Sequence, residues 1–164
     1  MASCELTLHP AKTKIVFCKK HKAKPVKKTI KFDFLGFSFQ PRTSSNKNGK
    51  MFLGYDCAIS QSSKKKIITD IRSTKFQRWT NRSISQIAEF FNPKIRGWIN
   101  YFGKFRKHKL NSVFYIFERR IMEWARRRYK RLGKSFIKAS KWFYRFRENN
   151  PNLFAHWERG FHNV

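Results

Sequence analysis

The sequence is poor in the residues on which covalent cross-links depend. Its 164 residues include three cysteines, Cys4, Cys18 and Cys57, which are widely spaced and follow no secretory signal. This pattern argues against a disulfide framework and favours a reducing compartment, the bacterial cytoplasm or an organellar matrix, over secretion. Cys18-x-x-His21 could supply half of a zinc site, but no second Cys/His pair with ligand spacing follows it. A reduced thiol beside a solvated histidine is the better interpretation.

Acidic residues are also scarce. The chain has 9 Asp and Glu against 38 Lys and Arg, and its three aspartates lie far apart in sequence. General acid–base or two-metal chemistry needs carboxylates gathered at one site. Glu118 and Glu123 are five residues apart on a predicted helix and so diverge, and Glu123 is better interpreted as a partner of Arg127 one turn later. We therefore expect no catalytic residue, no metal site and no cofactor in this chain.

The excess of basic residues predicts the partner. A formal net charge of +29 repels itself strongly unless a polyanion is near, so nucleic acid is expected. No apolar run reaches the roughly 18 residues of a spanning helix, and the basic residues are spread along the whole chain, which argues against a membrane. Aromatic residues make up 17% of the chain, too many for a disordered basic tail. The sequence predicts a folded basic protein with one fair-sized core.

The first third of the chain has the composition of β-strands. Lys12–Cys18 is rich in β-branched and aromatic residues, Phe32–Phe39 alternates around Gly36, and Met51–Ala58 can return as a third strand. Gly36 within such a run suggests a bulge or a close backbone approach. Pro41–Lys50 is predicted to be a polar loop. A sheet of three strands without a helix is only marginally stable by itself, so we expect it to pack against another part of the structure or against a partner.

From Ser60 onward the hydrophobic period is helical. Ser60 or Ser62 can cap a first helix, and Ser83 with Gln86 forms a capping-box pattern for a second. Asn111 or Ser112 can cap the longest helix, which Gly133 would end. A last helix is predicted from about Ser135 to Arg147, with four inward apolar residues: Phe136, Ala139, Phe143 and Phe146. Beyond it, an apolar clasp is expected to fold back: Leu153, Phe154 and Trp157.

The central stretch Asn92–Gly103 predicts a separate helix. Asn92 is a plausible N-cap and Pro93 suits the first helical position. Apolar residues recur at i, i+3, i+4 and i+7: Ile95, Trp98, Ile99 and Phe102. Gly97 lies on the opposite, polar side at a cost of about 1 kcal/mol relative to Ala, which suggests that another backbone, of protein or nucleic acid, comes close.

Basic side chains on the outward faces of these helices are the candidate nucleic-acid contacts. A row of charged side chains usually means only that a helix face is exposed to solvent. Here, however, the net charge of +29 exceeds what solubility requires. The last two helices are expected to present parallel basic faces. Tyr101 and Trp142 border polar faces and could stack on an unpaired base, although core packing remains the better interpretation for each ring alone. The predicted RNA-binding residues are Arg96, Asn100, Tyr101, Lys104, Arg119, Arg126, Arg127, Lys130, Arg131, Lys138, Lys141 and Arg145.

Four segments together resemble a known family. Arg96–Gly103 resembles the signature of the group II intron maturase domain, the thumb region of intron-encoded reverse transcriptases. Asp33–Phe37 upstream, and Trp124–Lys130 and Asn152–Trp157 downstream, fall in the order and spacing of that family. The resemblance covers nearly the whole chain. It implies an α+β, mainly α fold in which a small antiparallel β segment precedes a helical thumb/maturase bundle.

The resemblance also implies how the chain is divided into domains. Residues 1–58 would be the C-terminal remnant of a palm, with Leu35, Gly36 and Phe37 resembling the primer-grip turn, and residues 59–164 the thumb/maturase domain. The family's polymerase centre uses aspartates from two earlier motifs, one of them Tyr-x-Asp-Asp, and this chain has no Asp-Asp pair. We therefore expect no polymerase activity from this chain alone. Mg²⁺ would belong only to a complete polymerase, whose palm and fingers would come from a separate polypeptide.

In that family the thumb binds the template–primer duplex and intron RNA, and it assists splicing by holding the ribozyme fold. The implied partners are group II intron RNA and an RNA/DNA duplex, with a role in splicing and retrohoming. Two alternatives stay open. The chain could be an inactive remnant of a reverse transcriptase, or a fragment that works only with a separately encoded palm. It could also be a nonspecific basic DNA-binding protein.

Overall fold

The computed structural model describes residues 7, 9, 13, 15–17, 30–133 and 135–161. The chain divides into two compact units, residues 1–57 and 58–164. Within the described residues, three strands are followed by helices, which confirms the predicted α+β, mainly α class. Of the predicted strand Lys12–Cys18, residues 13 and 15–17 are in no strand, and its other members lie outside the described residues. The Cys18-x-x-His21 pair also lies outside them.

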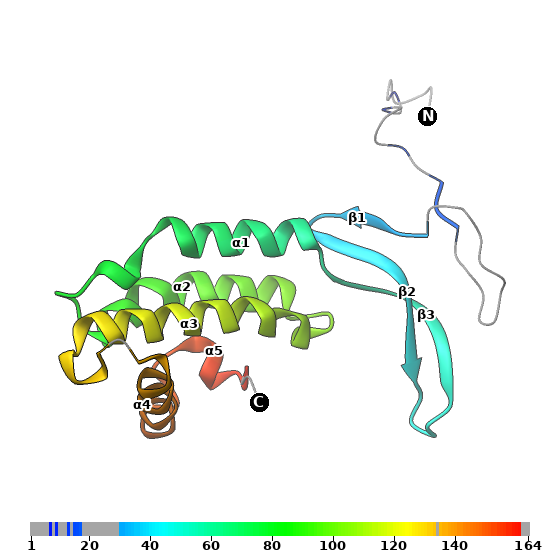
Figure 1. Ribbon diagram of the computed structural model, residues 1–164. Helices are drawn as coiled ribbons and strands as arrows, with labels where there is room; N and C mark the ends of the chain where they lie inside the picture. The colour runs from blue at the N-terminus through cyan, green and yellow to red at the C-terminus, as the bar shows by residue number, and fades with distance from the viewer. Residues whose placement is uncertain are drawn as a thin grey trace. The chain divides into compact units, whose positions relative to one another are not determined.

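The sheet has the order β1 (Phe32–Phe34), β2 (Phe37–Ser45), β3 (Met51–Ile59) (Figure 1). The third strand is therefore confirmed, but the predicted loop Pro41–Lys50 is wrong in its first half, because β2 continues through Pro41. Pairing of β2 with β1 ends opposite Phe32, at Phe39, so the missing N–H of Pro41 interrupts no bond to β1.

The turn between β1 and β2 contains two residues with positive φ. Phe34 pairs with Phe37, which leaves Leu35 at φ +47° and Gly36 at φ +80° as a two-residue loop. Two consecutive positive φ values define a type I′ turn, whose twist matches that of the flanking strands. Gly36 therefore lies in a hairpin turn rather than in the predicted bulge. Leu35 is held in a conformation that L residues other than Asn and Asp rarely adopt.

The helical unit contains α1 (Gln61–Ser73), α2 (Ile84–Phe102), α3 (Asn111–Arg128), α4 (Phe136–Asn149) and α5 (Ala155–Glu158). Short 3₁₀ turns lie at 76–78, 107–110 and 130–132. Figure 1 shows α1, α2 and α3 running alongside one another, while α4 runs across them. The expected parallel basic faces of α3 and α4 are therefore not formed.

Serine caps start three of the helices. The Ser60 side chain accepts a hydrogen bond from the backbone N–H of Ser63, and that of Ser135 accepts from Lys138. Ser83 and Gln86 form both halves of the predicted capping box. The predicted caps at Ser60, rather than Ser62, and at Ser83 are confirmed, and the last helix starts near Ser135 as predicted. Each depends on a hydrogen bond to a residue three positions away, which explains why the local sequence was sufficient.

The separate helix predicted to start at Asn92 does not exist. Helix α2 runs without interruption from Ile84, and Pro93 lies inside it. Asn92 has another role: its side-chain NH₂ donates to the Leu153 carbonyl at 3.0 Å, and its side-chain oxygen accepts from the Ala155 N–H at 2.9 Å. Pro93 is exposed, so solvent can hydrogen-bond to the helix carbonyl that lacks a donor. The Asn92 side chain therefore hydrogen-bonds to the backbone of the C-terminal segment and does not cap the helix that contains it.

Helix α3 also differs from the prediction at both ends. Neither Asn111 nor Ser112 caps it, because the 3₁₀ turn 107–110 leads directly into the helix and Leu110 occupies the cap position. The helix ends at Arg128, and Gly133, at φ +52°, closes the following 3₁₀ turn instead. With 18 residues it is one shorter than α2, so it is not the longest helix described.

Aromatic side chains dominate the core of the helical unit. Phe91 packs against Phe76 and Phe117, and the centroid of each of these two rings lies 4.9 Å from the centroid of the Phe91 ring. Trp124 is fully buried, and its indole N–H donates to the Trp79 carbonyl at 2.9 Å. Fully burying a side chain of this size contributes about 2–3 kcal/mol, so this cluster helps to hold α2, α3 and the segment 76–79 together.

The predicted C-terminal clasp is present. Phe154 and Trp157 are buried, with ring centroids 4.6 Å apart, and Trp157 packs against Phe143 of α4. The inward prediction for Phe136 is wrong. Its ring is exposed at the start of α4, where the guanidinium of Arg119 lies 5.5 Å from the ring centroid. The helical period of apolar residues places Phe136 on the apolar face of α4. Because α4 crosses α3, however, the first turn of α4 is not covered by α3.

Candidate nucleic-acid interface

Four of the predicted RNA-binding residues gather around one hollow beside α4, which we call the α4 groove. It has a volume of about 460 Å³. Two short elements build it, the 3₁₀ turn 130–132 and the outward face of α4. The lining residues are Arg131, Leu132, Lys138, Lys141, Trp142, Arg145, Phe146 and Asn149.

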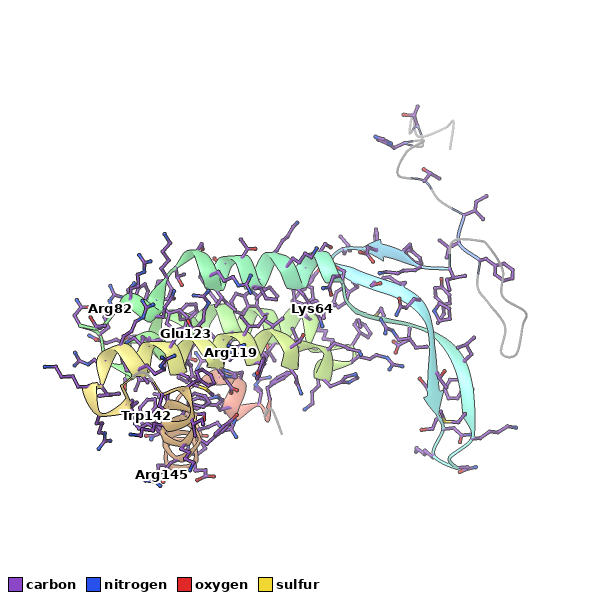
Figure 2. All side chains as sticks on the ribbon, viewed as in Figure 1. Lys64, Arg82, Arg119, Glu123, Trp142 and Arg145 are labelled. Atoms are coloured by element: carbon purple, nitrogen blue, oxygen red, sulfur yellow. The ribbon has the colours of Figure 1, made fainter. Side chains whose placement is uncertain are left out.

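The floor of the α4 groove is aromatic. The rings of Trp142 and Phe146 stack with centroids 5.3 Å apart and planes at 26°, and Tyr129 lies 5.4 Å from Trp142. All three side chains are half-buried, so they support the core and still reach solvent. Core packing and base stacking are therefore not exclusive for Trp142, which Figure 2 shows on α4 with Arg145.

The rim of the α4 groove is cationic. Arg131, Lys138, Lys141 and Arg145 are all exposed, and none of them forms an ion pair with a described residue. Arg131 and Arg145 offer planar forks suited to phosphate oxygens, whereas the two lysines act as point charges. Four uncompensated cations around two stacked rings can bind a phosphate backbone and one unpaired base.

Helix α3 places its predicted residues elsewhere. Arg126 and Arg127 line a second hollow of about 470 Å³ together with Glu123, whose carboxylate reduces the local positive charge. Arg119 lies against the Phe136 ring, and Lys130 is exposed in the 3₁₀ turn. Figure 2 shows Arg119 and Glu123 along α3.

Helix α2 presents its predicted residues on another surface. Asn100 and Lys104 line a hollow of about 400 Å³ at the C-terminal end of α2. Arg96 and Tyr101 are exposed on the same helix but line none of these three hollows. The primer-grip-like Leu35, Gly36 and Phe37 form the β1–β2 turn of the other unit. The predicted residues are therefore distributed over several surfaces, and of the three hollows described above the α4 groove gathers the most, four of them.

Sequence reasoning missed several lining residues. Asn149 belongs to the α4 groove, and Lys107, Arg159 and Phe161 belong to the hollow at the end of α2. Asn149 could have been found, since it lies on the face of α4 that carries Lys138, Lys141 and Arg145. The other three come from segments that are distant in sequence, so helical periodicity carries no signal for them.

The Glu118 carboxylate has structural partners on three sides. Glu118 is buried and accepts a hydrogen bond from the Trp157 indole N–H at 3.0 Å, with Arg147 at 3.7 Å and His156 at 3.4 Å. Within the described ranges, no three His, Cys, Asp or Glu side chains gather where they could hold a metal ion. None of the helices described has the length and apolarity needed to cross a membrane.

Comparison with known proteins finds a family match within the helical unit. A family model described as "Group II intron, maturase-specific domain" matches residues 64–142, just under half of the chain. The match extends from α1 into α4, as far as Trp142, and within these residues it confirms the resemblance inferred from the sequence. Two of the four segments, Asp33–Phe37 and Asn152–Trp157, lie outside it. No curated protein and no solved structure matches the chain.

Proposed function

We propose that this chain binds group II intron RNA and assists its splicing, a proposal that the match of residues 64–142 to the maturase-specific domain supports. The α4 groove carries the proposal. Its four cations, Arg131, Lys138, Lys141 and Arg145, surround the stacked rings of Trp142 and Phe146.

The chemistry of the groove favours structured RNA as its ligand. Folded RNA presents phosphates beside unpaired bases in loops and bulges, and proteins recognise such bases by stacking them on aromatic or guanidinium planes. A regular DNA duplex offers phosphates but no unstacked base. The half-buried rings of Trp142 and Phe146 can therefore stack on an unpaired base of RNA, whereas duplex DNA offers them no such base. The nonspecific DNA-binding alternative makes no use of these rings.

The test compares binding of a group II intron RNA fragment with binding of a DNA duplex of equal length. Lys138→Glu with Arg145→Glu reverses two groove cations, and Lys65→Glu with Lys66→Glu makes the same charge change at exposed positions of α1. We expect the groove variant to bind the RNA on the order of tenfold or more weakly than the α1 variant. Wild-type protein should bind the RNA more tightly than the duplex DNA.

Splicing provides the functional measurement. Wild-type protein and the α1 variant should accelerate splicing of the intron RNA at low Mg²⁺ concentration, and the groove variant should not. Equal loss of RNA binding in both variants would show that net charge alone drives binding. Equal affinity for RNA and DNA duplex would favour the nonspecific DNA-binding alternative. RNA binding without any effect on splicing would favour an inactive remnant.

A further inference from the structure

A second cationic hollow lies at the C-terminal end of α2, and we call it the α2-end groove. It has a volume of about 400 Å³. Three separate segments build it: the end of α2, the 3₁₀ turn 107–110, and the residues that follow α5. Its polar lining residues are Asn100, Lys104, Lys107 and Arg159. The family match ends at residue 142, so Arg159 lies beyond it.

The charge of this groove is uncompensated. Lys104, Lys107 and Arg159 are exposed, and no acidic side chain is among the described residues that line the hollow. Three cations on one concave surface repel one another unless an anion lies between them. The Asn100 amide adds two donors and one acceptor at the same rim. The lining therefore suits a ligand that carries several anionic oxygens.

The floor of the groove distinguishes it from the α4 groove. Its apolar members, Ile99 and Phe161, are only 7% and 4% exposed, and the Phe161 ring packs edge-to-face against Phe114 at 4.9 Å. The Lys107 ammonium lies 5.9 Å from the centre of the Phe161 ring and covers it further. A base therefore has no ring face to stack on. The α2-end groove can contact phosphate and sugar groups, but it lacks the stacking platform of the α4 groove.

Two glycines, Gly97 within α2 and Gly103 at its C-cap, have different explanations. At Gly103 an added Cβ would lie 2.4 Å from the Ile99 carbonyl oxygen, so the fold itself requires glycine there. At Gly97 an added Cβ would meet nothing within 4 Å, and the residue is exposed. Glycine weakens a helix interior, and no packing within the described residues accounts for it at Gly97. Gly97 does not line the groove, but it lies on the same face of α2 as Asn100, three residues later, which does.

We infer that the α2-end groove binds the phosphodiester backbone of an RNA through Lys104, Lys107, Arg159 and Asn100, without reading bases. Bare backbone at Gly97 lets the RNA strand lie against α2 as it enters the groove. This inference rests on the proposed RNA-binding function and adds a second contact to it. The two grooves then have different roles, since the α4 groove engages an unpaired base and its phosphates whereas the α2-end groove engages backbone alone.

The first experiment reverses charge in the α2-end groove. Lys104→Glu with Lys107→Glu should weaken binding of the intron RNA fragment on the order of tenfold relative to Lys65→Glu with Lys66→Glu. The weakening should be the same for a second RNA of equal fold whose loop nucleotides lack their bases. Trp142→Ala, which removes one stacking ring of the α4 groove, should instead lose discrimination between these two RNAs. Circular dichroism and thermal melts verify that all variants are folded.

The second experiment uses Gly97→Ala. Alanine should raise the midpoint of thermal unfolding by about 3 °C, because it favours the helix and meets no neighbour. The same variant should bind the RNA fragment severalfold more weakly, because a methyl group then separates the RNA strand from the helix. A loss of affinity together with a gain in stability cannot come from damage to the fold.

The outcomes separate the inference from the proposed function. If the α4-groove variant loses affinity while the α2-end variant matches the α1 variant, the inference is overturned and the proposed function stands. If neither groove variant differs from the α1 variant, the proposed function fails as well. Unchanged RNA affinity in Gly97→Ala would overturn the role assigned to Gly97, and base-dependent weakening in Lys104→Glu with Lys107→Glu would overturn backbone-only contact.

Discussion

In the sheet unit the described apolar side chains lie largely at the surface, whereas in the helical unit they close into a core. Phe34 and Leu35 of the sheet unit are 60% and 67% exposed, while Phe76 and Phe91 of the helical unit are fully buried. Both units are rich in aromatic residues, so composition does not explain the contrast. The number of packed layers does: three helices can surround a side chain, but one sheet covers only one of its faces. The helical unit therefore carries its own stability.

Removing the central indole should have the largest effect. Trp124→Ala deletes a fully buried ring and its hydrogen bond to the Trp79 carbonyl, so the free energy of unfolding should fall by about 3–5 kcal/mol. Phe34→Ala, an aromatic truncation in the sheet unit, should cost less than about 0.5 kcal/mol. Urea denaturation followed by the helical circular dichroism signal measures the first loss, and hydrogen exchange of the β2 amides measures the second. Comparable losses would break the contrast between the units. Trp98, which is half-buried, should give an intermediate value.

Truncating the buried carboxylate should have a smaller effect. Glu118→Ala removes the acceptor of the Trp157 indole N–H and the anion beside Arg147 and His156. Leaving these buried groups without their partner should cost about 1–3 kcal/mol. The matched control is Glu148→Ala on the exposed side of α4, which should change stability by less than about 0.5 kcal/mol. If Glu118→Ala melts like Glu148→Ala, the carboxylate does not hold the C-terminal clasp.

The hairpin of the sheet unit should respond in the opposite direction. Leu35 has φ +47°, and Asn at this position of a type I′ turn relieves strain, so Leu35→Asn should stabilise the hairpin by about 0.5–1 kcal/mol. Gly36→Ala, at φ +80°, should destabilise it by about 1–2 kcal/mol. Hydrogen exchange of the β2 amides reports on this unit alone. Destabilisation by Leu35→Asn would show that the leucine side chain contributes more than its backbone strain costs.

Repulsion between two lysines should give the smallest effect. Burial, and to a lesser degree the neighbouring Lys109, lowers the pKa of Lys64, whose ammonium donates to the Ser112 hydroxyl at 3.0 Å. Because the folded pKa lies below the unfolded one, the unfolded state binds this proton more tightly. Stability should therefore rise with pH between the folded pKa and the ordinary value. Lys109→Gln should raise the Lys64 pKa part of the way, as an NMR titration of its side chain would show. No change would leave burial as the whole cause.

Local features of the helical unit could be predicted from the sequence, and long-range ones could not. The caps at Ser60 and Ser83 depend on residues three positions away, and both were predicted. Asn92 has the same capping chemistry, but its partners, Leu153 and Ala155, lie 61 and 63 residues later. Nothing near Asn92 distinguishes the two cases, so a helix start was predicted where α2 continues.

The same division applies to the interface. Lys138, Lys141 and Arg145 share one face of α4, and helical spacing was sufficient to group them. Lys107 and Arg159 meet at the α2-end groove only because the chain after α5 returns to the end of α2. In the sheet unit, alternation predicted the strands Phe32–Phe39 and Met51–Ala58 but missed the turn at Leu35, where a bulky residue occupies a conformation usually left to Gly or Asn.

The salt dependence of RNA binding tests the central claim, that the helical unit holds RNA phosphates in a defined groove. If roughly six to ten phosphates are engaged, raising salt from about 50 to 200 mM should weaken wild-type binding by on the order of 10³ to 10⁵. Lys138→Glu with Arg145→Glu should reduce the slope of log K against log salt by about 1.4–1.8, while Lys65→Glu with Lys66→Glu should leave it near the wild-type value. Affinity that is nearly flat with salt, or equal slopes for the two variants, would contradict this claim.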